Sequence, residues 1–358
     1  MFPTTPTQGV AQPLAQAPDV RYPQPWAQAP TIPPPTTPRR ERKWLIIVVF
    51  CLFAGLIPET IITSSTSPLK MLLNPLSLPF IALFYGTADL LVREIIVRRR
   101  VGLASVLLLG AAFGFVNEGV AAGTWYTVRP QGYLFIGGVD WTWALALTIF
   151  HIVISVMTPI AFIEIVFPSI RGKPLLRRWG MAVCAVLFFG FALLVALTPL
   201  YRPYRLAALA VAVLFSLLAL ALSRRRTPTL ANARPLLGLW RLRIMGFVAM
   251  LAYFFLIYLF PVLVAAPLKS APNGLLIAQG IDAVALLAFA VVVIARGWLW
   301  SRRAGWSPRQ NLALLIGGVT FTTLVMLLPG QIALGEPFAT IPFYALLITL
   351  TVRWRRQT

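Results

Sequence analysis

The chain has little of what a soluble domain or a conventional metal site needs. Only 11% of its 358 residues are charged, and it has ten carboxylates, one histidine and two cysteines. Globular domains carry about 25% charged residues, so a composition that is 59% hydrophobic excludes that class. Cys51 and Cys184 have no second Cys or His at ligand spacing, so we expect no disulfide, no metal site and no cofactor. A phosphate-binding loop and a His-Glu-x-x-His motif are also missing.

Long hydrophobic runs dominate what is present. A helix crosses a bilayer in about 17–25 apolar residues, and suitable runs occur ten times, the last being the shortest. The predicted spans are 44–64, 75–97, 101–122, 141–168, 179–200, 206–223, 244–266, 275–295, 311–329 and 338–352. The sequence therefore predicts an all-α, polytopic integral membrane protein with a single transmembrane helical domain over residues 41–358.

The first 40 residues have a different composition. Residues 1–40 are rich in Pro, Gln, Ala and Thr and have too little periodic apolar content to form a core. This predicts a disordered cytoplasmic tail with some polyproline character. The tail is either a docking site for a proline-recognising partner or an untethered extension.

The net charge of +21 is explained by where the basic residues lie. All but five of the 31 Lys and Arg residues fall in segments that are inside if the N-terminus is cytoplasmic. The five in outer segments are Lys70, Arg129, Arg202, Arg205 and Lys269. This is the positive-inside pattern, so we expect both termini to be cytoplasmic, in the cell membrane of a bacterial-type cell. Anionic lipids on the cytoplasmic side are the expected partner, and nucleic acid is not.

Ionisable residues within the spans are the most informative feature. They gather in the first four spans, where we find Glu59, Asp89, Glu94, Glu118, His151 and Glu164, whereas the second half has only Asp282. Each costs roughly 2.5–3.5 kcal/mol at membrane depth, so a partner or a function is expected.

The acids near the inner ends have a structural explanation. Asp89 with Arg93, and Glu94 with Arg98, are spaced for intrahelical ion pairs. Glu164 is close to the basic inner loop. We interpret these three acids as anchors.

Glu118 and His151 are harder to explain structurally. Glu118 shares a helix face with Gly110 and Gly114, which allow another helix to approach, so we expect it to face protein. His151 belongs to a polar stripe that includes Ser155. The stripe either lines a proton or solute path or packs between helices.

We predict that Glu118 and His151 line one polar cavity in the outer half or middle of the bundle. The other candidate residues of this cavity are Asn117, Glu59, Asp282 and Ser155.

Glu118 and His151 lie on consecutive antiparallel spans, an arrangement that resembles the CPBP intramembrane proteases, the group that includes bacterial relatives of CAAX prenyl proteases. That family has Glu-Glu followed four residues later by Arg, a Phe four residues before a His on the next helix, and a second His. Here Asn117 replaces one acid, no Arg follows, Leu147 replaces the Phe, and no second His exists. The resemblance covers about 35 of the 358 residues and implies a degenerate, catalytically inactive relative.

Three classes of function remain open. We favour a transporter or permease for a small solute, whose identity the sequence does not reveal, and no oligomeric state is indicated. A non-catalytic membrane scaffold or accessory subunit is the first alternative. The second is an intramembrane enzyme with Glu118 as general base and His151 as base or metal ligand, which is the least expected of the three.

Overall fold

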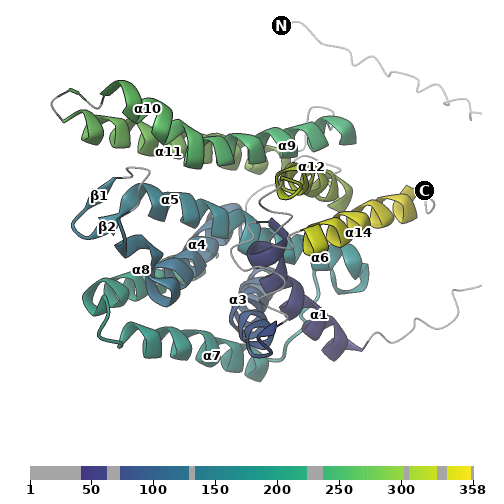
Figure 1. Ribbon diagram of the computed structural model, residues 1–358. Helices are drawn as coiled ribbons and strands as arrows, with labels where there is room; N and C mark the ends of the chain where they lie inside the picture. Colours follow the sequence, from purple (N-terminus) through teal and green to yellow (C-terminus); the bar gives the residue numbers. More distant parts are fainter. Residues whose placement is uncertain are drawn as a thin grey trace, which may run out of the picture. The chain divides into compact units, whose positions relative to one another are not determined.

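Helices form at each of the ten places where the sequence predicts a span (Figure 1). The computed structural model describes residues 42–62, 73–128, 134–223, 237–268, 270–271, 273–301, 306–328 and 337–355. The predicted tail over 1–40 lies outside the described residues, as do Lys70, Arg129 and Lys269. Contacts join Arg42–Thr358 into one compact unit.

Several of these helices change winding along their length, from an α-helix to a π-helical segment labelled η. The first five helical rods are α1 (Lys43–Leu56) with η1 (Ile57–Ile62), α3 (Ser77–Arg99), α4 (Leu103–Gly114) with η2 (Phe115–Ala122), α5 (Trp141–Phe150) with η4 (His151–Met157) and α6 (Thr158–Val166), and α7 (Arg178–Ala196). The remaining rods are α8 (Arg202–Leu222), α9 (Leu239–Phe254) with η6 (Phe255–Leu259) and α10 (Phe260–Leu268), α11 (Gly274–Ser301), α12 (Pro308–Met326) and α14 (Pro337–Arg355). Two short 3-10 turns, η3 (Thr124–Tyr126) and η5 (Pro168–Ile170), lie between rods.

Within the described ranges, seven helices are long and apolar enough to cross a membrane, judged by length and composition. They are Lys43–Ile62, Leu103–Ala122, Trp141–Val166, Arg178–Ala196, Arg202–Leu222, Leu239–Leu268 and Gly274–Trp300. The all-α, polytopic fold class is thereby confirmed. The number of crossings and the side of the termini stay predictions, because α3, α12 and α14 do not meet the same criterion.

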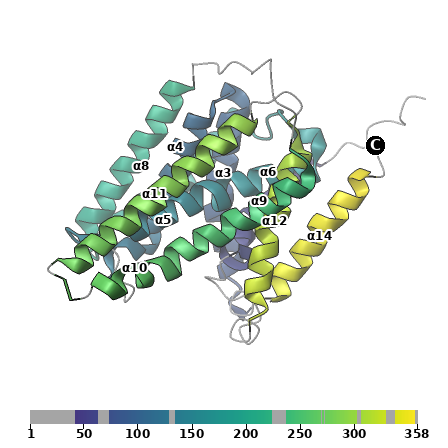
Figure 2. The ribbon, with the colours of Figure 1, turned by 90° about the horizontal axis from the view of Figure 1, so that it is seen from above.

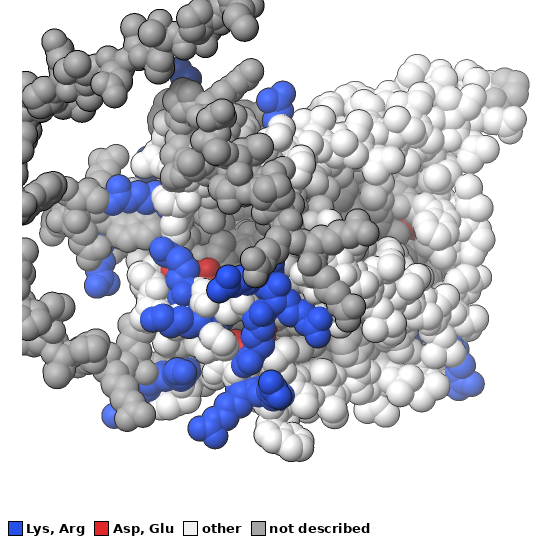
Figure 3. All heavy atoms as spheres, turned by 180° about the vertical axis from the view of Figure 1, so that it is seen from behind, with Lys and Arg blue, Asp and Glu red and all other residues white. Residues whose placement is uncertain are grey.

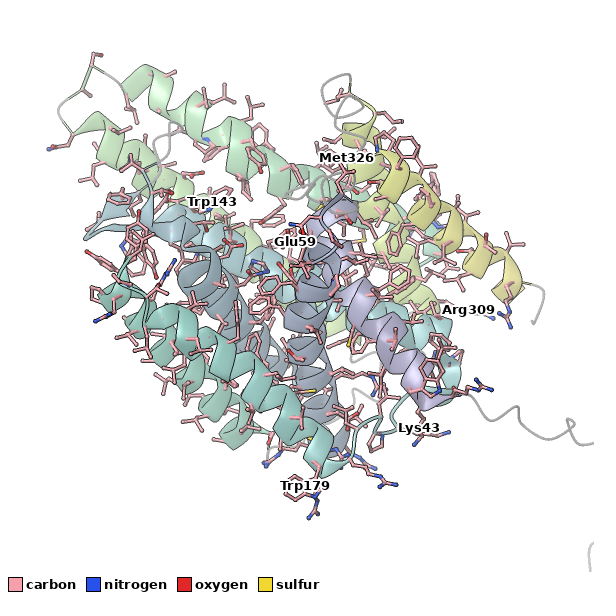
Figure 4. The ribbon with its side chains drawn as sticks, turned by 60° about the horizontal axis from the view of Figure 1, so that its bottom comes forward. Lys43, Glu59, Trp143, Trp179, Arg309 and Met326 are labelled. Atoms are coloured by element: carbon pink, nitrogen blue, oxygen red, sulfur yellow. The ribbon has the colours of Figure 1, made fainter. Side chains whose placement is uncertain are left out.

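The rods alternate in direction. In Figure 4, Lys43, Trp179 and Arg309, which lie at the starts of α1, α7 and α12, are toward one side of the view. Glu59 and Met326 lie at the other ends of the first rod and of α12, toward the opposite side. We refer to the side of Lys43 as the basic end and to the side of Glu59 as the far end.

Two hydrophobic cores hold the rods together. The first lies among α1, α3, α4, α7 and α8 and contains Phe50, Phe84, Phe113 and Phe188. The second lies among α9, α11, α12 and α14, and α12 packs against both α9 and α14 (Figure 2). The α5–η4–α6 rod contributes side chains to both cores, with Ile163 in the first and Phe162 in the second. His151 therefore lies on a rod that is enclosed from two sides.

The segment between α4 and α5 carries a structure that the helix pattern did not predict. Strands β1 (Phe135–Ile136) and β2 (Val139–Asp140) form an antiparallel hairpin. Its turn is Gly137-Gly138, and both residues have positive φ, as a two-residue hairpin turn requires. In the sequence, the two adjacent glycines after an aromatic stretch were the feature that could have predicted this hairpin.

Two aromatic residues in the segment after η2, Trp125 and Tyr126, are buried. Trp125 packs edge-on against Phe115, with ring centroids 4.8 Å apart. The Tyr126 hydroxyl donates to the Gly119 carbonyl at 2.6 Å. Burial raises the pKa of the Tyr126 hydroxyl to about 12, and nearby Arg205 opposes the rise. This segment therefore closes over the far end of α4 and η2.

At the basic end, the buried guanidinium of Arg93 connects α3 to α6 and to the loop after α6. Arg93 has a fully buried side chain whose Nη2 lies 3.0 Å from Glu164 Oε1, and Nη1 lies 3.5 Å from Glu94 Oε1. Arg93 also donates to the carbonyls of Ile170 and Lys173. This network ties α3 to the end of α6 and to the loop that follows it.

The expected pairing within α3 is half correct. Glu94 and Arg98 do pair, at 2.9 Å. The predicted Asp89–Arg93 pair is wrong, because Arg93 turns toward Glu94 and Glu164 instead. Both Asp89 carboxyl oxygens are buried without a hydrogen-bond partner among the described residues. Spacing alone could not show that a carboxylate from another rod competes for the same guanidinium.

Candidate functional site

Candidate residues on the first, third and fourth rods lie where the helix changes from α to π winding. Glu59 lies in η1, Asn117 and Glu118 lie in η2, and His151 and Ser155 lie in η4. A π-helical turn is rare and is found frequently at functional sites, since the extra residue re-aims the side chains around it. Candidate residues lie within π-helical segments on three different rods. This repeated agreement, and not a single polar residue, identifies the region as a candidate functional site.

Local sequence explains part of this winding. Pro58 lies within η1, and Pro159 follows η4. Proline has no N–H, so a carbonyl one turn earlier loses its usual partner. The backbone N–H and the hydroxyl of Thr158 both donate to the Val153 carbonyl, the hydroxyl at 2.9 Å, which fixes the end of η4 just before Pro159.

Glycine brings the third and fourth rods together at the site. A Cβ on Gly114 would lie 3.3 Å from the His151 Cβ, and one on Gly110 would lie 2.9 Å from the Ile152 Cα. The small-residue face of α4 therefore allows η4 to approach closely, as the sequence indicated. Glu118, on the continuation of that face, then reaches the imidazole.

The first chain of hydrogen bonds runs from Ser155 through His151 to Glu118. His151 Nδ1 lies 2.8 Å from the Ser155 Oγ, and Nε2 lies 2.9 Å from Glu118 Oε1. An ionised carboxylate only accepts hydrogen bonds, so with Glu118 ionised the ring carries its proton on Nε2. In the neutral ring Nδ1 then accepts the Ser155 hydroxyl proton. The Thr124 hydroxyl donates to the other Glu118 oxygen.

The second chain runs from Asn117 through Tyr85 to Glu59. Asn117 Nδ2 donates to the Tyr85 hydroxyl at 2.5 Å, and this hydroxyl donates to Glu59 Oε1. Tyr85, on α3, was missed by sequence reasoning. The available signal was a tyrosine in the middle of an apolar span, because a buried phenol needs a polar partner.

The two chains share a wall. The Phe113 ring packs edge-on against His151, with centroids 5.4 Å apart, and its centroid lies 5.2 Å from that of Tyr85. Asn117 and Glu118 are also adjacent in sequence. We call this group the outer polar cluster: Glu59, Tyr85, Asn117, Glu118, His151 and Ser155.

Burial within the cluster follows a gradient. Ser155 is 0% exposed and His151 is 2% exposed, and Tyr85 and Asn117 are also buried. The Glu118 side chain is 13% exposed, and Glu59 is also partly exposed. Each chain therefore begins at a buried group and ends at a carboxylate with a small exposed area.

The polar side chains along the fourth rod make two kinds of hydrogen bond. Thr148, three residues before His151, and Thr158, three residues after Ser155, donate to carbonyls of their own helix. Ser155 instead bonds the His151 ring. Of these polar residues, only His151 and Ser155 belong to the cluster.

Asp282 lies apart from this group. It is 2% exposed and sits on α11, which packs against α5, and its electrostatic neighbour is Asp140 at the start of α5. No hydrogen bond or ion pair connects it to Glu118 or His151 in the part of the chain that the structure describes.

The cluster has the order of a serine nucleophile, an imidazole base and a carboxylate, but lacks access. A nucleophilic serine must reach a substrate, and Ser155 is fully buried. The described residues contain no group of three His, Cys, Asp or Glu that could hold a metal. Two cavities lined by described residues lie elsewhere, and neither is lined by a residue of this cluster. As it stands, the arrangement can hold, share and exchange a proton.

Comparison with known proteins adds a family without a known activity. The sequence model of an uncharacterized membrane protein family matches residues 45–352. No curated protein and no solved structure matches the chain.

Proposed function

Since the chain belongs to that uncharacterized membrane protein family and is a multi-pass helical membrane protein, we propose that it is a proton-coupled transporter or permease for a small solute. The outer polar cluster is the proposed site of proton exchange. The proposal includes the predicted orientation, with both termini on the cytoplasmic side of a bacterial-type cell membrane.

One observation carries the proposal: two chains of hydrogen bonds, which connect three π-helical segments, end at the partly exposed Glu59 and Glu118. Placing a carboxylate at membrane depth costs roughly 2.5–3.5 kcal/mol. Ionisable residues at that depth often mark the path of an ion or a proton.

Proton exchange then follows from the chemistry of the three groups. A proton that arrives at Glu118 removes the negative charge that orients the His151 ring. The imidazole can instead accept that proton and donate through both ring nitrogens, so the Ser155 hydroxyl must turn to a new acceptor. Each protonation state therefore favours a different arrangement of η2 against η4. Such a two-state element is what proton coupling needs.

A scaffold is the second candidate, and a separate observation favours it. Arg93, Glu94 and Glu164 satisfy one another locally at the basic end. Polar groups paired in this way fasten helices without any transport. If the same holds for the outer polar cluster, the chain is a non-catalytic scaffold or accessory subunit.

Proton flux into vesicles distinguishes the two functions. We would reconstitute the full chain in proteoliposomes that contain a pH-sensitive dye and impose a membrane potential with and without a panel of small solutes. The wild-type chain should acidify the vesicles in the presence of at least one solute. Glu118→Gln should remove this flux, because the amide cannot bind and release a proton.

A matched tyrosine pair serves as the control. Tyr85→Phe removes the hydroxyl between Asn117 and Glu59 and should slow the flux, whereas Tyr204→Phe, at the start of α8, should leave it unchanged. Equal flux in Glu118→Gln and wild type would overturn the proposal in favour of the scaffold.

A further inference from the structure

A cavity of about 400 Å³ lies between α3, α4, α7 and α8. Its wall is almost entirely apolar and includes Leu91, Ile95, Leu109, Phe188 and Leu220. Alanines on the facing helices, among them Ala112 and Ala185, leave the space open. The volume lies within the range of about 300–1,000 Å³ that is usual for small-molecule sites.

This cavity is distinct from the outer polar cluster but touches its wall. Phe113 lines the cavity and also packs against the His151 ring. The cavity reaches the surface on the α7 side, where its lining residue Ala182 is exposed. The neighbouring surface of α7 is apolar, with Val183 and Val186 exposed. An occupant would therefore enter from the lipid phase.

A single charge stands in the cavity wall. Arg99, near the C-terminal end of α3, lines it and is exposed. Its neighbours Arg93 and Arg98 are neutralised by Glu94 and Glu164. Arg99 makes no hydrogen bond or ion pair with another residue in the described ranges. Figure 3 shows basic side chains gathered toward one part of the rear face, while most of the described surface there is uncharged.

An apolar cavity with one free cation at its end matches an anionic amphiphile. Water would find almost no hydrogen-bond partners along this wall, so it does not fill the space well. Basic pockets between membrane helices on the cytoplasmic side are known to bind anionic lipid headgroups. An acyl chain satisfies the apolar wall, and a phosphate satisfies Arg99.

We propose that this cavity binds one acyl chain of an anionic phospholipid, with the lipid phosphate at Arg99. Binding would fill the space beside Phe113, whose ring also packs against His151. The site does not depend on transport, because neither Glu118 nor His151 contacts the lipid.

Lipid retention by the purified full chain tests the site. After delipidation, we would add phosphatidylglycerol or phosphatidylcholine and count bound lipids by native mass spectrometry. The wild-type chain should retain one phosphatidylglycerol more strongly than phosphatidylcholine. Arg99→Gln should weaken phosphatidylglycerol retention by about fivefold, the expected effect of one basic residue near the surface, and should weaken phosphatidylcholine retention less, because the choline cation offsets the charge of its phosphate.

Two control variants separate the site from general lipid contact. Ala185→Phe fills the cavity and should abolish the retained phosphatidylglycerol, whereas Val186→Phe, on the exposed side of the same helix, should not. Arg353→Gln, an exposed arginine on α14, should behave as wild type. Undiminished retention in Arg99→Gln, or loss of both lipids to the same extent, would overturn the proposal, and the exposed position of Arg99 keeps that variant folded.

Discussion

Replacing His151 with glutamine is expected to lower solute-dependent proton flux by roughly 10²–10⁴-fold, the usual contribution of a positioned proton-transfer group. His151 is the one residue in the outer polar cluster that contacts both Glu118 and Ser155. Glutamine can keep one of these hydrogen bonds, but it cannot take up and release a proton. No other imidazole in the chain can replace it, because His151 is the only histidine.

The control for this variant lies one turn earlier on the same rod. Thr148 donates to the Ala144 carbonyl and not to the cluster, so Thr148→Val should keep the wild-type flux. Ser155→Ala should have an intermediate effect, because it removes only the enclosed end of the chain. A His151→Gln protein that is folded and transports at the wild-type rate would show that the imidazole is a packing residue.

Replacing Arg93 with methionine is expected to lower the free energy of unfolding by about 3–5 kcal/mol, the usual cost of leaving a buried charge without its partner. The side chain is fully buried, and its loss would leave Glu164 without an ion-pair partner among the described residues, whereas Glu94 would keep only Arg98. The carbonyls of Ile170 and Lys173 would lose donors as well. The unfolding midpoint in detergent, measured with increasing denaturant, reports the change.

Two further variants identify the cause of this destabilisation. Arg171→Met removes an exposed arginine that bonds only the Glu164 carbonyl, so it should change the free energy of unfolding by less than about 1 kcal/mol. Adding Glu164→Gln to Arg93→Met should restore part of the loss, because one unpaired charge is gone. An Arg93→Met protein as stable as Arg171→Met would mean that the network does not fasten α3 to the following loop.

The positions of the helices could be predicted from the sequence because long apolar runs have few alternatives in a membrane. Gly110 and Gly114 indicated that another helix approaches the face of Glu118, since small residues on one face mark such an approach. These signals are local, so a single sequence contains them.

What the sequence did not reveal depends on contacts between distant segments. The Asp89–Arg93 pair fails because Glu164, on another rod, competes for the guanidinium. Tyr85 was missed because its partners Glu59 and Asn117 lie on two other helices. The π-helical segments depend on packing between rods as well as on nearby prolines. Asp282 was grouped with the cluster residues because it lies at a similar depth along its span, but it lies on a different part of the bundle.

A direct test of the central claim uses the fact that the chain has one histidine. Protein purified without a histidine tag and labelled with 15N-histidine gives nitrogen signals from the His151 ring alone, recorded in bilayers by solid-state NMR over a range of pH. The hydrogen bonds at 2.9 Å to Glu118 and 2.8 Å to Ser155 predict that both ring nitrogens shift in Glu118→Gln and stay unchanged in Tyr204→Phe. Ring signals that are identical in wild type and Glu118→Gln at every pH would contradict a proton shared between Glu118 and His151.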